Sequence, residues 1–227
     1  MKIVYSLSRN LYPFLLPSIM SLLDHNEVEK IYILALDKEL PYELPEQCEV
    51  IEANPLEWFD PDGPNWRTQF TPMAMLRAAT TKYIKDDKVI QLDVDTIVTD
   101  DLSGLWDIDL GTDFCAMVDE KLGQWKPFGE KYYNAGVMLL NLKQIREEKL
   151  DDRMIEELNT KPLRFLEQEC WNYMAAGRIR ELDVRYNECF ATGQTDKPAI
   201  VHYAGYTHYL HGVPRGEYYD RYRQFEK

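Results

Sequence analysis

Short apolar runs alternate with amphipathic stretches over most of the sequence. Seven of the runs are brief and rich in apolar or β-branched residues, which is typical of buried strands. They cover residues 3–7, 31–36, 48–51, 89–92, 114–118, 137–142 and 200–203. Helical patterns separate several of these runs, so the order of the elements predicts an α/β fold.

The first helical pattern lies between the first two strand candidates. Apolar residues from Phe14 to Leu23 recur at helical spacing and stop near Asp24. Because a proline inside a helix removes a backbone hydrogen bond, we expect the ordered helix to begin near Pro17. A strand, a helix and a strand within about 35 residues predict a right-handed βαβ unit with parallel strands.

Three further helices are predicted, over residues 72–84, 143–158 and 167–176. Residues 54–69 contain Pro55, Pro61 and Pro64 and are expected to form a surface loop. The sequence has no internal repeat and no Gly- or Ser-rich linker. Since typical domains have roughly 100–200 residues, we expect one domain over residues 1–227.

The chain is acidic, with 26 Lys and Arg against 39 Asp and Glu and a formal net charge of −13. Such a charge repels the phosphates of nucleic acids and anionic lipids at long range. We therefore expect no nucleic-acid partner. A phosphorylated ligand would need a bridging divalent cation or a local nest of donors.

The cysteines and the N-terminus indicate the compartment. Cys48, Cys115, Cys170 and Cys189 form no CxxC pair, so free and mostly buried thiols are expected. The first ten residues lack the apolar core of a signal peptide, and no run of about 18 apolar residues follows. We expect a cytoplasmic protein without an integral membrane segment.

Asp93 and Asp95 follow the strand candidate at residues 89–92, and ligands of open α/β sheets bind at this end of a strand. In extended backbone the two carboxylates would point the same way and repel each other unless a cation lay between them. The chain has two other pairs of this spacing, Asp60–Asp62 and Asp107–Asp109, which no buried strand precedes. We expect those to be surface pairs and Asp93–Asp95 to bind metal.

Two chemistries suit a strand that ends in these carboxylates. In a haloacid dehalogenase-type phosphatase the first aspartate attacks phosphorus. In a nucleotide-sugar transferase the carboxylates hold Mn²⁺ or Mg²⁺ against a diphosphate leaving group. A phosphatase of that type usually opens with this strand, whereas here a βαβ unit and a further helix precede it, which favours the transferase.

Six ordered segments carry a more specific resemblance: IVYSLSRN, VIQLDVDTIV, YYNAGVMLLNL, LEQECWN, RYNECF and IVHYAG. In this order the chain resembles family 8 glycosyltransferases, the group of glycogenin and the bacterial lipopolysaccharide galactosyltransferases. The resemblance implies a GT-A-like α/β fold, with a mixed central sheet flanked by helices. It also implies retaining transfer of a hexose, glucose or galactose, from a UDP-sugar to an acceptor hydroxyl. Nothing in the sequence identifies the acceptor as a glycan, a lipid-linked sugar or a protein.

Carried over to this chain, the resemblance makes Asp93, Asp95 and His202 the ligands of Mn²⁺ or Mg²⁺, which both phosphates of UDP would also bind. It places Glu167 and Gln168 at the reacting face of the sugar. The remaining donor-site positions border the nucleoside (Ser6, Ser8, Asn10, Val94), the sugar (Arg77, Asn134, Ala135) and the phosphates (Gly205, His208).

Three of these positions depart from the family pattern. Ser8 stands where an aspartate is usual, Glu167 where a shorter aspartate is usual, and His208 at the position of a phosphate-binding lysine. A neutral imidazole offers a hydrogen bond but no permanent charge, so stabilisation of the diphosphate would depend more on the metal.

Ordinary structural roles remain open for several of these residues. His202 could be a core histidine, Arg77 could pair with Asp86 or Asp87, Gln168 could make a helix contact, and Asn134–Gly136 could be a strand entry. No strong nucleophile stands out, so we expect the acceptor hydroxyl to attack on the face that UDP leaves, with a covalent sugar on Glu167 as the rival. A non-catalytic nucleotide-sugar-binding module is a further alternative.

Overall fold

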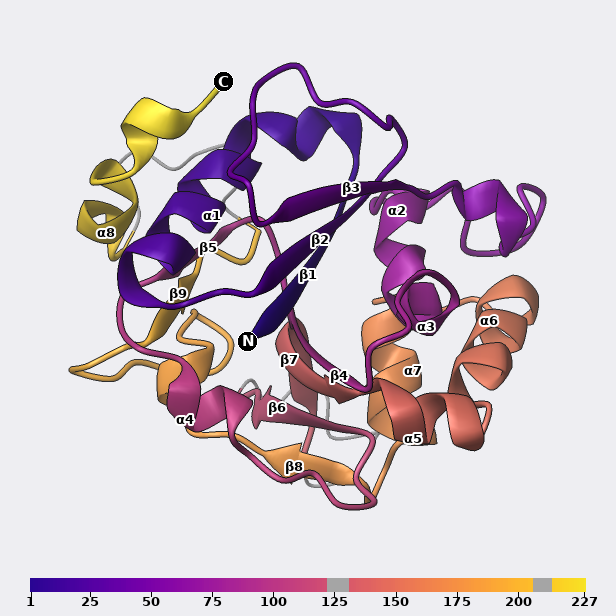
Figure 1. Ribbon diagram of the computed structural model, residues 1–227. Coiled ribbons are helices and arrows are strands. Elements are labelled where there is room, and N and C mark those ends of the chain that lie inside the picture. Colours follow the sequence, from indigo (N-terminus) through magenta and orange to yellow (C-terminus); the bar gives the residue numbers. More distant parts are fainter. Residues whose placement is uncertain (122–130, 206–213) are drawn as a thin grey trace.

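The computed structural model describes residues 1–121, 131–205 and 214–227. Its centre is a seven-stranded sheet in the order β3-β2-β1-β4-β7-β6-β8 (Figure 1). These strands are β1 Lys2–Leu7, β2 Lys30–Ala35, β3 Cys48–Glu52, β4 Lys88–Leu92, β6 Cys115–Asp119, β7 Tyr133–Asn141 and β8 Ile179–Glu181. A separate two-stranded sheet consists of β5 Thr96–Val98 and β9 Ile200–His202.

The central sheet is mixed. β1 pairs in parallel with both β2 and β4, whereas β7 pairs antiparallel with β4 and β6. The chain runs outward from β1 to β3 and then returns to the other side of β1 as β4. Ligands of such sheets bind where the strand order reverses, which here is the carboxyl end of β1 and β4.

Helices cover both faces of this sheet (Figure 1). α1 and α4 pack with one buried cluster that contains Ile3, Tyr5 and Leu7 of β1, and Val4 points into the other cluster. The alternation follows from the two-residue period of a strand. The helices are α1 Tyr12–His25, α2 Pro72–Met75, α3 Thr80–Tyr83, α4 Ser103–Trp106, α5 Leu142–Glu147, α6 Leu150–Thr160, α7 Glu167–Met174 and α8 Gly216–Asp220.

The parallel βαβ opening is confirmed, but its helix begins earlier than predicted. α1 starts at Tyr12, because Pro13 lies in the first turn, where a backbone N–H has no helical partner. Pro17 is inside the helix and buried, so packing outweighs the one hydrogen bond that it removes.

Other predicted boundaries also change. The helix at 72–84 is divided by a 3-10 segment, Leu76–Ala79, and the helix at 143–158 is interrupted at Lys149, whose φ is +53°. β7 begins at Tyr133, so Asn134 lies inside the strand and not at a turn before it. β5 and β8 were not predicted. β5 begins only four residues after the end of β4, and β8 consists of the residues IRE, which form no apolar run.

Smaller expectations are confirmed. All four cysteines are free, and three of them are buried. Asp60, Asp62, Asp107 and Asp109 are exposed, as expected for surface pairs. Over the described residues, the helices are too short or too polar to cross a bilayer.

Candidate metal and donor site

The turn between β4 and β5 carries Asp93 and Asp95. Its backbone is held from two sides, because the N–H of Asp93 donates to the carbonyl of Gly136 and the N–H of Tyr203 donates to the carbonyl of Asp95, both at 2.8 Å. The Thr96 hydroxyl donates to the carbonyl of Asp93 at 2.7 Å. The segment is thus a turn and not the extended backbone that the sequence suggested, but its two carboxylates still converge.

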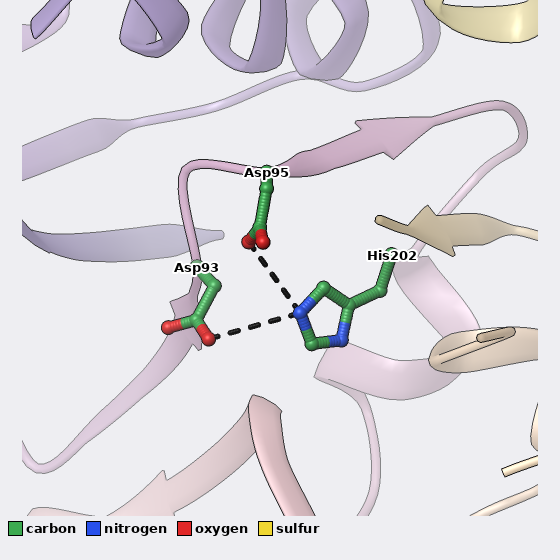
Figure 2. Close-up of side chains that lie close together, drawn as sticks. All are labelled: Asp93, Asp95 and His202. Carbon is green, nitrogen blue, oxygen red and sulfur yellow. Dashed lines mark ion pairs between the residues drawn. The ribbon is translucent and has the colours of Figure 1, made fainter. Parts of the chain in front are cut away.

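His202 completes a three-residue cluster. It ends β9, where it is the antiparallel partner of Thr96 in β5, and its ring points toward both carboxylates (Figure 2). The ring Nε2 lies 3.4 Å from an oxygen of Asp95 and 3.8 Å from an oxygen of Asp93. One ligand atom from each residue falls within 4.8 Å of the others.

This cluster fits a divalent cation. Two ligands at roughly 2.1 Å from one ion lie about 3.0–3.5 Å apart, close to the distances seen here. Carboxylate oxygens suit Mg²⁺ or Mn²⁺ and an imidazole nitrogen suits Zn²⁺ or Fe²⁺, so the three residues fit a divalent cation without selecting one. Burial alone would lower the pKa of His202, but the charge of Asp95 raises it well above its usual value, so the cluster favours positive charge.

Arg77 lies between two acidic side chains. Its guanidinium hydrogen-bonds to Asp93 through Nη1 and to Glu167 through Nη2, while Asp86 pairs with Lys2 and Asp87 with Arg146. The surface pairs that were the alternative are therefore wrong for Arg77. Its Nε is buried and has no hydrogen-bond partner in the described part of the chain.

Glu167 is enclosed at the start of α7. Only 1% of it is exposed, and burial raises the pKa of its carboxyl although Arg77 acts in the opposite direction. Its contact with Arg77 is the ion pair that connects α7 to the helical segment before β4. This acid is thus buried and paired with a cation.

The predicted sugar positions lie side by side. The side-chain oxygen of Gln168 accepts from the N–H of Ala135 at 2.9 Å, and its Nε2 donates to Glu120 at 3.3 Å. Asn134 donates to the same Glu120 carboxylate at 2.8 Å. Gln168 and Asn134 are thereby joined through an acid that sequence reasoning missed.

The predicted nucleoside positions follow the neighbouring strand. Ser6 at the end of β1 donates to the carbonyl of Met73 at 3.0 Å, and Ser8, just beyond β1, donates to Asn10. Val94 is buried between the two aspartates. Gly205, whose φ is +78°, lies three residues after His202. His208 lies outside the described residues.

Two further residues that sequence reasoning left without a role contact His202. An added Cβ at Gly136 would lie 2.1 Å from the ring Cε1 of His202, so only glycine leaves room for this imidazole. Asn187 accepts from the ring Nδ1 at 2.8 Å. Their signals were the glycine of NAG and the asparagine of RYN, both of which are ambiguous without coordinates.

Replacing Gly136 by alanine is expected to displace His202 from the cluster with Asp93 and Asp95, which fits a divalent cation. Overpacking of this kind costs about 1–3 kcal/mol in stability, and a misplacement of about 1 Å at a site costs about 100-fold in activity. Calorimetric titration with Mn²⁺ measures the loss of metal affinity.

Gly104→Ala is the control for this substitution. Its added methyl would meet only the hydroxyl of Tyr186 at 2.9 Å, the end of a side chain that can move. Unchanged Mn²⁺ affinity in Gly136→Ala would contradict the expectation that this glycine keeps His202 in place as a metal ligand.

The amino-acid sequence matches the model of a known protein family. The model described as Glycosyl transferase family 8 matches residues 2–209. A Haemophilus influenzae protein that carries the name of a glycosyltransferase is 27% identical over 208 residues, covering 82% of this chain and 63% of that protein. Glycosyltransferase GlyD of Streptococcus pneumoniae is 32% identical over 163 residues, covering 68% of this chain and 19% of that protein. The chain thus spans less than two thirds of either relative.

Solved structures agree on the fold. A crystal structure of an active-site mutant of LgtC superposes with a TM-score of 0.79 at 20% identity, covering 99% of this chain and 95% of that chain. LgtC in complex with donor and acceptor sugar analogs gives a TM-score of 0.76 at 21% identity, covering 100% of this chain and 95% of that chain. The predicted GT-A-like architecture is confirmed.

Proposed function

The chain belongs to glycosyl transferase family 8, and on that premise we propose that it is a metal-dependent, retaining hexosyltransferase that uses a UDP-sugar. Glucose or galactose would pass from the donor to an acceptor hydroxyl. The observation that carries the proposal is the convergence of Asp93, Asp95 and His202 beside the cluster of Asn134, Gln168 and Arg77. Residues 1–227 would form one catalytic domain.

Asp93, Asp95 and His202 would hold Mn²⁺ or Mg²⁺. A cation bound there would supply Lewis-acid stabilisation of the departing diphosphate, which an acidic chain needs because its own charge repels phosphate. Arg77 orients one of these ligands, since it holds one oxygen of Asp93 while the other oxygen of Asp93 faces His202.

Donor recognition would involve the residues around Arg77. Buried N–H groups normally have a hydrogen-bond acceptor. The buried Nε of Arg77 is therefore suited to a hydrogen bond with the UDP-sugar. Asn134 and Gln168 flank the acid Glu120, an arrangement suited to the hydroxyl groups of a hexose. Ser6, Ser8, Asn10 and Val94 would border the nucleoside at the end of β1 and in the turn after β4.

The surroundings of Glu167 favour attack on the face that UDP leaves. Its carboxylate is buried and neutralised by Arg77, which weakens it as a nucleophile. Gln168 uses its side-chain oxygen on the N–H of Ala135. The acceptor hydroxyl would then attack the sugar directly, and the UDP phosphate would take its proton. A covalent sugar on Glu167 is the rival, and mass spectrometry of a trapped intermediate would reveal it.

The experiment that tests the function is release of UDP from UDP-glucose and UDP-galactose, with and without Mn²⁺ and with EDTA. We expect UDP release to depend on metal. We also expect NMR of the product to show that the anomeric configuration of the donor is retained. UDP binding without turnover on any acceptor or on water would favour the binding module. Hydrolysis of simple phosphate esters without use of a UDP-sugar would favour the phosphatase.

A further inference from the structure

A chain of hydrogen bonds leads from the backbone of β7 to the ring of His202. The N–H of Gly136 donates to the side-chain oxygen of Asn134 at 2.9 Å, and Asn187 donates its Nδ2 to the same oxygen at 2.8 Å. The Oδ1 of Asn187 in turn lies 2.8 Å from the Nδ1 of His202. We call Asn134 and Asn187 the asparagine relay.

The direction of every bond in the asparagine relay follows from its first member. A backbone N–H can only donate, so the atom of Asn134 that faces Gly136 is its oxygen. The other end of that amide then donates to the Glu120 carboxylate at 2.8 Å, which fixes the same orientation independently. The orientation of the Asn134 side-chain amide is thus determined by hydrogen bonds at both its oxygen and its nitrogen.

The same logic continues into Asn187. Because the oxygen of Asn134 accepts, Asn187 presents its NH₂ to it and turns its own oxygen toward the imidazole. The Nδ1 of His202 therefore carries the hydrogen. The lone pair of the neutral ring is left on Nε2, the atom that lies 3.4 Å from Asp95 and 3.8 Å from Asp93.

We propose that Asn187 is a positioning residue, which sets the Nδ1–H tautomer of His202 so that Nε2 is the metal ligand. Such partners of a ligating histidine fix its ring and increase its basicity, and their loss costs about 10–100-fold in metal affinity. The relay also joins the ligand to Asn134, so the metal and sugar parts of the site share one network. This inference rests on the proposed function for its metal and its sugar.

The asparagine relay and His202 lie in the interior of the protein. Asn187 is fully buried and Asn134 and His202 are 7% and 5% exposed, so water does not replace a lost partner. Asn187 also lies directly before Glu188, whose carbonyl accepts from the N–H of His202 at 2.8 Å. Backbone and side chain of one segment thus hold the histidine at two points.

Two substitutions of Asn187 separate the two bonds. Asn187→Ala removes both, and we expect Mn²⁺ affinity to fall about 10–100-fold by calorimetric titration. Asn187→Asp keeps an acceptor for Nδ1–H but cannot donate to Asn134, so metal affinity should stay within about threefold. KM for the UDP-sugar should then rise about tenfold, which corresponds to about 1.4 kcal/mol for one lost hydrogen bond.

Asn65→Ala is the matched control. Asn65 is 2% exposed and donates to the carbonyls of Leu158 and Lys161, in another part of the fold. Both alanine variants should melt at lower temperature, and only the one at position 187 should change Mn²⁺ affinity. Equal losses of affinity in both, or none at Asn187→Ala, would overturn the proposal.

The tautomer itself gives a readout that needs no turnover. In ¹⁵N-labelled protein, at a pH where the ring is neutral, His202 should have a protonated Nδ1, and Asn187→Ala should lose this preference. A protonated Nε2 in the wild type would overturn the relay. Wild-type protein that releases no UDP from any UDP-sugar would contradict the proposed function alone, since the NMR result would still decide the tautomer.

Discussion

Asp95→Asn is expected to lower kcat/KM for the proposed turnover of a UDP-sugar by about three orders of magnitude. The substitution keeps the size of a side chain that is 12% exposed, but it removes one of two carboxylates from the proposed cation site. Charge stabilisation by a catalytic cation is worth several kcal/mol, and about 4 kcal/mol corresponds to a thousandfold in rate. Steady-state release of UDP at saturating Mn²⁺ measures the effect.

Asp109→Asn is the control for Asp95→Asn. Asp109 belongs to an exposed pair of the same spacing, whose side chain caps the N–H of Gly111. Its replacement should leave kcat/KM within about twofold, because surface substitutions rarely exceed about 0.5 kcal/mol. Turnover by Asp95→Asn near the wild-type rate would exclude this aspartate as a necessary ligand.

Arg77→Met is expected to destabilise the protein by about 3–5 kcal/mol. Removing one member of a buried ion pair leaves its partners charged in a medium that solvates them poorly. Here two carboxylates, Asp93 and Glu167, would lose their shared cation. Urea denaturation followed by circular dichroism measures the change in free energy of unfolding.

The loss in Arg77→Met should depend on pH. Burial already raises the pKa of Asp93 and of Glu167, and without Arg77 both pKa values would rise further above those of the unfolded chain. The folded variant would then bind more protons than the unfolded variant, so its stability increases as pH falls. We expect the deficit relative to wild type to be larger at pH 8 than at pH 5.

Two further variants test the cause. Arg185→Met breaks an exposed pair with Asp100 and should cost less than about 1 kcal/mol. Adding Glu167→Gln to Arg77→Met removes one stranded charge and should restore part of the stability. If Arg77→Met lowers the free energy of unfolding by no more than Arg185→Met does, the ion pairs of Arg77 contribute no more to stability than an exposed ion pair.

The sequence predicted the strands of the central sheet well, because each buried strand is a compact apolar run. It failed at β5, which begins only four residues after the end of β4, and at β8 of the central sheet, which has no apolar run. It also failed at the start of α1, where Pro17 suggested a later start that burial overrides. Helix divisions such as the one at Lys149 depend on tertiary packing and left no local signal.

For the site, the residue types were informative and the geometry was not. The ordered motifs brought Asp93, Asp95 and His202 to notice, but the extended backbone assumed for the two aspartates is a turn. Glu120, Gly136 and Asn187 gained their places only from distances across strands, because contacts between residues far apart in the sequence cannot be derived from spacing. The pairing of Arg77 with Glu167 is another such contact.

The short sheet of β5 and β9 also affects how the molecule is made. Asp93 and Asp95 leave the ribosome long before His202, so the three side chains cannot meet until β9 has been synthesised and has paired with β5. An ion held by both ends would close a loop of about 100 residues, which is worth about 4.7 kcal/mol in the chain-entropy description of a covalent link of that size. Metal uptake would therefore be a late event, and it would stabilise only chains in which β9 has already been synthesised and has paired with β5.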